Sequence, residues 1–165
     1  MADAEWSSWM TFYSAAASAS AAMTGLVFVG LSINLSRVLT IPGMVGRCAE
    51  TIILLGLALI SALQSLIPGQ TLSALGWGIG PMAIIAWILP VVVQWRWYSK
   101  RHFRHYAHVL VRIALHQAST LPMLIASILL INLHADARYW LADGILLTLV
   151  AGMVSAWVVM VEIVR

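Results

Sequence analysis

Charged residues are scarce in this sequence of 165 residues. Only 9% of the chain is Asp, Glu, Lys or Arg, whereas about 25% of an average soluble domain is charged. Hydrophobic residues make up 62%. This balance disfavours an ordinary soluble domain and is typical of a protein that crosses a membrane several times.

Cysteine and catalytic motifs are equally scarce. Cys48 is the only cysteine, so no disulfide can form within the chain. The sequence contains no HExxH, GxSxG or P-loop motif and no paired acidic residues inside an apolar segment. No acidic or basic side chain occupies the middle of such a segment, which disfavours a proton-coupled transporter and a voltage sensor. We therefore expect a protein that is not an enzyme and needs no cofactor.

Histidine is the residue type that most invites a metal or haem interpretation. His105, His108 and His116 share a helical face, but only His116 lies within an apolar segment. Bis-histidine haem ligation would need a second histidine at the same depth. A zinc site on His102, His105 and His108 is disfavoured, because steps of three spread these side chains around a helix and no carboxylate or cysteine stands nearby in the sequence. We expect solvated interfacial histidines and no metal.

Five apolar segments are each long enough to cross a membrane as a helix, which takes about 20 residues. The fourth is expected to extend into the cytoplasm from about residue 100, and the five cover residues 12–35, 49–67, 75–93, 113–133 and 141–161. The acidic start followed by small residues reverses the order of a cleavable signal peptide, so we expect the first segment to be retained. Residues 67–70, IPGQ, predict a tight turn. The predicted fold is an all-α bundle of five transmembrane helices in a single domain.

The positive charges predict which side of the membrane each end occupies, because Lys and Arg accumulate in cytoplasmic loops. With the N-terminus outside and the C-terminus in the cytoplasm, eight of the nine Lys and Arg residues fall on the cytoplasmic side. Arg138 alone falls on the other side. Tryptophan and tyrosine gather near both predicted interfaces, as in other membrane proteins. We expect a multi-pass protein with this orientation.

Most of the positive charge lies in the loop after the third segment, QWRWYSKRHFRHYAHVLVR. Basic residues near a membrane surface attract anionic lipid head groups, each contributing on the order of 1 kcal/mol. We expect such contact, and no nucleic-acid partner, for Arg96, Lys100, Arg101, Arg104 and Arg112. A docking surface for a cytoplasmic protein is the alternative. At the start of the second segment, Arg47 and Glu50 stand three residues apart and predict a structural ion pair near a helix N-terminus.

The first segment contains the stretch SAAASASAAMTGLVFVG, which is dominated by Ala, Ser and Gly. Small residues are selected where transmembrane helices approach closely, and polar groups are poorly placed against lipid. We expect this helix to be surrounded by protein, and its packing positions are Ser14, Ser18, Ala21, Gly25, Ser32 and Asn34.

Small residues in later segments are candidate partners for the first helix. They are Gly76 and Gly80 in the third segment and Gly144, Thr148, Gly152 and Ser155 in the fifth. If these faces meet, the bundle closes around the first helix. The alternative is that small faces remain for self-association or for another membrane protein.

Two further alternatives concern pores and lipids. Ser14, Ser18, Gly25 and Ser32 stand near a seven-residue repeat, so in a homo-oligomer they could line a pore. Prolines are expected to bend the third and fourth helices, and a lipid or small apolar molecule could bind between the bent helices.

Residues 23–55 resemble the opening half of a family of short, uncharacterised bacterial integral membrane proteins. The matching motifs are TGL at residues 24–26, SINL at 32–35 and PGMVGRCAET at 42–51. Some members of that family are labelled modulators of a membrane-bound FtsH-type protease. The resemblance implies a bacterial cytoplasmic membrane, and with the packing pattern it predicts a non-enzymatic scaffold or modulator that acts through helix contacts.

Overall fold

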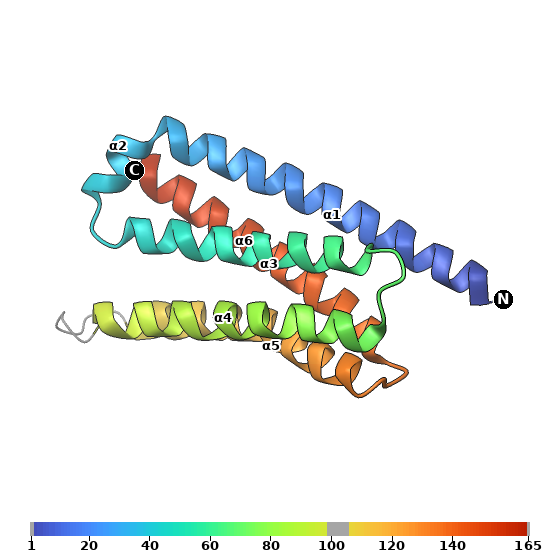
Figure 1. The fold of residues 1–165 in the computed structure, drawn as a ribbon. Helices are drawn as coiled ribbons and strands as arrows, with labels where there is room; N and C mark the ends of the chain where they lie inside the picture. The colour runs from blue at the N-terminus through green and yellow to red at the C-terminus, as the bar shows by residue number, and fades with distance from the viewer. Residues whose placement is uncertain (1, 99–105, 165) are drawn as a thin grey trace.

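A computed structural model describes residues 2–98 and 106–164, and within these the side chains of residues 8–92 and 113–163. The described chain is helical apart from short connections (Figure 1). The helices are α1 (Ala2–Ile33), α2 (Leu35–Thr40), α3 (Met44–Ser65), α4 (Leu72–Tyr98), α5 (Tyr106–Ile131) and α6 (Ala137–Val164).

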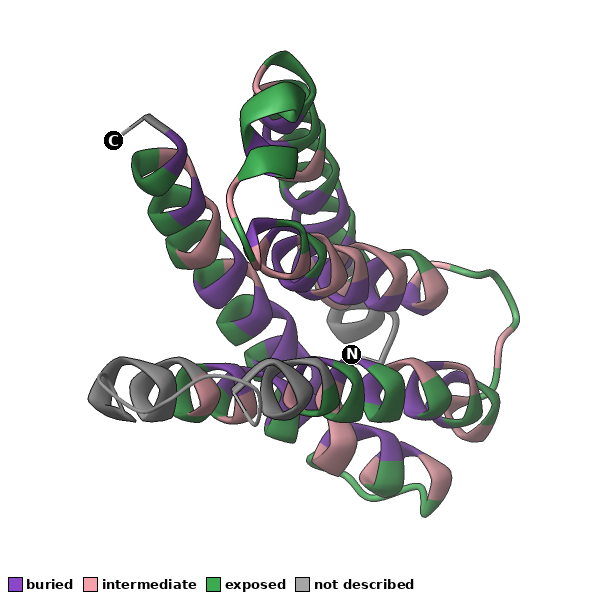
Figure 2. Ribbon diagram, turned by 90° about the vertical axis from the view of Figure 1, so that its left-hand side faces the viewer, coloured by how far each residue is buried: buried purple, intermediate pink, exposed green. Residues whose placement is uncertain are grey.

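Five of these helices are long and apolar enough to cross a membrane, which confirms the predicted number. Their apolar spans are Ser8–Ile33, Met44–Ser65, Leu72–Val92, Ile113–Ile131 and Ala137–Ile163. The N-terminus lies at one end of the bundle and the C-terminus lies beside α2 at the other end (Figure 1). Exposed and buried residues alternate along the helices, as expected if each helix turns one side to lipid (Figure 2).

The short helix α2 was not predicted, and Asn34 explains it. The Asn34 side-chain amide donates a hydrogen bond to the Gly30 carbonyl (2.9 Å), and the Asn34 carbonyl accepts from the backbone N–H groups of Arg37 and Val38. Asparagine interrupts helices in this way because its side chain competes for backbone groups. Val38 of α2 is buried in a cluster with Leu31, so α2 lies against the end of the bundle.

Two glycines with positive φ shape the turns on either side of α3. Gly43 has φ +84° and precedes the first residue of α3. Gly69 has φ +72°, and the Gln70 N–H donates to the Ile67 carbonyl at 3.4 Å. Proline followed by glycine at the two central positions is typical of a type II turn. The predicted turn at residues 67–70 is confirmed.

The central helix of the bundle is α3. It packs against α1, α4 and α6, whereas α1 packs mainly against α3 and to a smaller extent against α6. Of the most apolar stretch of each helix, 56% is buried inside the protein for α3 and 28% for α1. The prediction that the bundle closes around the first helix is therefore wrong.

The small residues of α4 pack against α5. A Cβ atom placed on Gly76 would lie 2.9 Å from the Ile131 nitrogen and 2.9 Å from the Ser127 carbonyl oxygen, and one on Gly80 would lie 2.7 Å from the Ser127 hydroxyl. The Ser127 hydroxyl donates to the Gly76 carbonyl at 2.9 Å. Only glycine permits this approach of two backbones. The expectation that Gly76 and Gly80 pack on the first helix is wrong.

The small residues of α6 pack against α5 and α3. A Cβ atom on Gly144 would lie 3.0 Å from Met123 of α5, and one on Gly152 would lie 2.7 Å from Leu55 of α3. Thr148 is buried and its hydroxyl donates to the Gly144 carbonyl, while Ser155 is partly buried. Neither predicted glycine of α6 packs against α1, because Gly144 lies against α5 and Gly152 lies against the central helix α3.

Candidate functional site

The outer side of α1 carries only small residues over three helical turns. From Ser14 to Gly25, every exposed residue is alanine, serine or glycine. Eleven steps of about 1.5 Å give this strip a length of roughly 16 Å. We call it the small-residue face of α1, and it consists of Ser14, Ala15, Ser18, Ala19, Ala21, Ala22 and Gly25. Of the other predicted packing positions, Ser32 is exposed further along α1 and Asn34 is partly buried.

The inner side of α1 already provides the close contact with the bundle. Tyr13, Ala16, Ala17 and Ser20 are buried, and Ser20 is fully so. Tyr13, Ala16 and Ala17 belong to a hydrophobic cluster that includes Ala58 of α3. The small-residue face therefore lies on the side of α1 that the bundle does not use.

Gly25 shows that this face has no packing role within the described chain. Apart from the adjoining part of α1 itself, no described atom lies within 4 Å of a Cβ atom built on Gly25. At Gly30, one helical turn further and partly buried, the same construction meets the Met160 side chain of α6. Glycine in a helix interior costs about 1 kcal/mol relative to alanine. The fold of this chain gives no reason for that cost at Gly25.

Several serine and threonine hydroxyl groups on α1 donate hydrogen bonds within the helix. Ser18 donates to the Ser14 carbonyl (2.9 Å), Thr24 to the Ser20 carbonyl (2.7 Å) and Ser32 to the Phe28 carbonyl (2.8 Å). Such bonds to the carbonyl four residues earlier let a hydroxyl face lipid without a protein partner. The expectation that the polar side chains of α1 require surrounding protein is therefore wrong. The size of the exposed residues is the feature that indicates a missing partner.

An ion pair joins α3 and α6 near the end of the bundle where α2 lies. Arg47 of α3 forms an ion pair with Glu162 of α6. The sequence missed this pair because its members stand far apart in the chain. Glu50 is 8% exposed, and its ion pair with Arg47 stays a prediction.

The predicted lipid-contacting cations fall outside what the structure describes. Lys100, Arg101 and Arg104 lie outside the described residues. Arg96 and Arg112 belong to α4 and α5, but their side chains lie outside the described part of the chain. Contact of these five residues with anionic lipid stays a prediction.

His116 joins α5 to α4 at a proline. The His116 side chain is 5% exposed, and its Nε2 lies 2.8 Å from the carbonyl oxygen of Ala86. Pro90 stands four residues after Ala86 and has no N–H group to donate to that carbonyl. Because a carbonyl oxygen only accepts hydrogen bonds, we assign a hydrogen to Nε2, which donates in place of the missing backbone N–H. His116 is therefore buried, and the expectation of a solvated interfacial histidine is wrong for it.

The stability of the α4–α5 pair is expected to depend on the hydrogen bond between His116 and the Ala86 carbonyl. Replacing His116 by leucine is expected to lower the free energy of unfolding by about 1 kcal/mol, because the Ala86 carbonyl loses its donor. Pro90→Ala restores a backbone N–H, so the cost of His116→Leu should fall to near zero in that background. Unfolding of the four proteins of this double-mutant cycle in mixed detergent micelles measures both costs. Equal costs in the two backgrounds would contradict the assignment.

Over the residues that the structure describes, no group of three or more His, Cys, Asp or Glu side chains could hold a metal ion. Comparisons with protein-family models, with curated proteins and with solved structures gave no match to this chain. The function is therefore argued from the geometry of the helices.

Proposed function

We propose that this protein is a non-enzymatic integral membrane scaffold or modulator that acts through contact between transmembrane helices. The small-residue face of α1 is its contact surface. Gly25 is the observation that carries this proposal. It is an exposed glycine within a long apolar helix, and a Cβ atom built on it would have no atom of another described helix within 4 Å. In lipid, helices associate by close van der Waals packing, for which glycine, alanine and serine are selected.

The same face of a second copy is the partner that fits this surface best. Ser14, Ser18 and Ala22 stand four residues apart, as do Ala21 and Gly25, which matches the small-xxx-small pattern of helix pairs. A surface of uniformly small residues is complementary to itself across a two-fold axis. We therefore expect a homo-oligomer in which α1 of one copy packs on α1 of its partner.

The proposed location is the cytoplasmic membrane of a bacterium, with the N-terminus outside and the C-terminus in the cytoplasm. The distribution of Lys and Arg supports this orientation. Five apolar helices support a multi-pass protein with its two ends on opposite sides of the membrane. The resemblance of residues 23–55 supports the bacterial membrane.

A pore is the second candidate function, and one observation favours it. Ser14, Ser18, Gly25 and Ser32 are all exposed, so they remain available to face a common axis in an oligomer. The hydroxyl oxygens of such a lining could accept hydrogen bonds from water, although the protons of Ser18 and Ser32 are donated to the backbone. Ion flux into liposomes that falls on Ser18→Leu would support a pore. No flux through verified oligomers would exclude it.

Native mass spectrometry of the protein extracted with its surrounding lipid tests the proposal directly. A homo-oligomer would support self-association through α1. A stable complex with a second membrane protein would support the modulator role and identify that partner. A monomer with no protein partner would contradict the proposal.

A further inference from the structure

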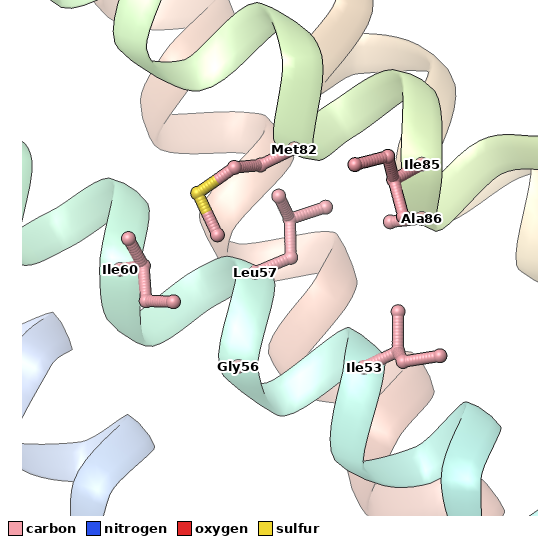
Figure 3. A pocket seen from close by; sticks show the side chains of 7 residues that line it. All are labelled: Ile53, Gly56, Leu57, Ile60, Met82, Ile85 and Ala86. Carbon is pink, nitrogen blue, oxygen red and sulfur yellow. The ribbon is translucent and has the colours of Figure 1, made fainter.

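A groove lies between α3 and α4, with a cavity volume of about 220 Å³ (Figure 3). Ile53, Leu57 and Ile60 of α3 stand on one side of it, and Met82 and Ile85 of α4 on the other. No lining side chain carries nitrogen or oxygen. This lining offers a water molecule no side-chain hydrogen-bond partner. Its natural occupant is therefore apolar.

The groove exists because residue 56 is glycine. Gly56 lines it, and apart from the adjoining part of α3 itself no described atom lies within 4 Å of a Cβ atom placed there. Gly76, Gly80, Gly144 and Gly152 differ, because a Cβ atom on each would collide with a neighbouring helix. Gly56 is thus not needed for contact between α3 and its neighbours. The absence of a side chain at Gly56 leaves space in the groove instead.

The groove opens sideways and lies near the middle of the bilayer. Ile85 on its rim is 59% exposed, so the groove is reached from the lipid side of the bundle. Ala86 lines it and precedes Arg96 by ten residues of the same helix, which corresponds to about 15 Å. That distance is about half the thickness of the hydrocarbon core. A lipid tail whose head group lies at the level of Arg96 reaches this depth.

We propose that the α3–α4 groove binds one acyl chain of an anionic phospholipid from the cytoplasmic leaflet. Charge selects the head group, since Arg96 is a positively charged residue of α4, and Lys100 and Arg101 follow it in the sequence. The apolar lining and the lateral opening select the chain. This site is separate from the small-residue face of α1, and it adds a lipid ligand to a protein proposed to act by helix contact.

Native mass spectrometry with equimolar phosphatidylglycerol and phosphatidylcholine tests the site. The wild-type protein is expected to retain one phosphatidylglycerol molecule. Gly56→Leu places a side chain in the groove, and its Cβ atom would have no atom of another described helix within 4 Å, so retention should fall by about tenfold or more. Ala118→Leu is the matched control, since it places the same side chain on another exposed part of the bundle and should leave lipid retention unchanged. Equal retention by wild type and Gly56→Leu would overturn the proposal.

The head group and the chain are tested separately. Arg96→Gln should reduce the preference for phosphatidylglycerol over phosphatidylcholine, and a short-chain phosphatidylglycerol should not displace the long-chain lipid. Equal retention of the two lipids by the wild type, or full displacement by the short-chain lipid, would contradict the assignment. The helical circular dichroism and thermal unfolding of Gly56→Leu should match those of the wild type, which shows that lost lipid is not lost fold. Loss of lipid from Ala118→Leu as well would show that an added leucine elsewhere on the bundle also removes lipid, and would overturn the groove.

Discussion

Replacing Gly25 by leucine is expected to dissociate the homo-oligomer. Two helices packed through small residues lie close together, and a leucine side chain on each copy would hold the backbones apart. Because no hydrophobic effect drives helices together in lipid, the lost van der Waals contact is not offset. We expect the dissociation constant to rise by at least tenfold, which corresponds to about 1.4 kcal/mol. Energy transfer between labelled copies, diluted in liposomes at increasing lipid-to-protein ratio, measures this constant.

Ala118→Leu provides the matched control for this experiment. Ala118 is an exposed small residue on α5, so its replacement adds the same side chain to another outer surface of the bundle. That variant should associate like the wild type. Gly25→Leu itself should fold normally, since no described atom lies within 4 Å of a Cβ atom at that position. If both variants associate as tightly as the wild type, α1 is not the contact surface.

Replacing Gly76 by leucine is expected to prevent folding of the α4–α5 pair. The first atom of the new side chain would lie 2.9 Å from two backbone atoms of α5, in Ser127 and Ile131. Flexible side chains can move away, but a helix backbone moves only as a unit. The hydrogen bond from the Ser127 hydroxyl to the Gly76 carbonyl would also be lost. Overpacking alone typically costs 1 to 3 kcal/mol, so with the lost bond we expect a loss of about 3 kcal/mol or more.

Thermal unfolding in detergent, followed by circular dichroism and by recovery of monodisperse protein, measures this effect. Gly76→Ala should give an intermediate loss, because it adds the Cβ atom alone. Ala118→Leu serves as the control, with a midpoint close to that of the wild type. An unchanged midpoint for Gly76→Leu would show that α4 and α5 are not packed as closely as the structure has them.

The number of long apolar helices was predictable, because a lipid bilayer requires apolar segments of sufficient length to form helices. A segment in hydrocarbon must satisfy its backbone groups internally, so an apolar run of sufficient length becomes a helix. The turn at residues 67–70 was predictable for a similar local reason, since proline and glycine favour its backbone angles. These features depend on residues that are neighbours in the sequence.

The packing partners of the small residues were not predictable. Gly25 and Gly76 look alike in the sequence, as small residues four positions from another small residue. In the structure, Gly76 contacts the backbone of α5 and Gly25 contacts no described residue outside its own surroundings in α1. A small residue indicates a close approach, but it does not identify the approaching group. For that reason the wrong helix was placed at the centre of the bundle.

The link between His116 and Ala86 was missed for the same reason. Pro90 indicates that the carbonyl of Ala86 lacks its helical donor, and this much follows from the sequence. That the replacement donor comes from His116 depends on how α4 and α5 are aligned. The short helix α2 could have been found, since Asn34 is a residue that commonly interrupts helices.

Gly25 and Gly56 are glycines of long apolar helices at which a Cβ atom would have no atom of another described helix within 4 Å. We interpret each as space kept for something outside the chain, a second copy at α1 and a lipid chain at the α3–α4 groove. Substitutions at the two positions should therefore have separable effects. Gly25→Leu should affect association and Gly56→Leu should affect lipid retention.

A cysteine cross-linking scan of α1 in intact membranes tests the proposed contact surface most directly. Cys48 is the only native cysteine, so Cys48→Ala provides a background for single cysteines at Ser14, Ser18, Ala21, Gly25, the buried Ala16 and the control Ala118. Disulfides form only where Cα atoms approach to about 5.5–6 Å. We predict covalent dimers from the positions of the small-residue face and none from Ala16 or Ala118. No dimer at any α1 position, or equal dimer yields at all six, would contradict the proposal that this face joins two copies.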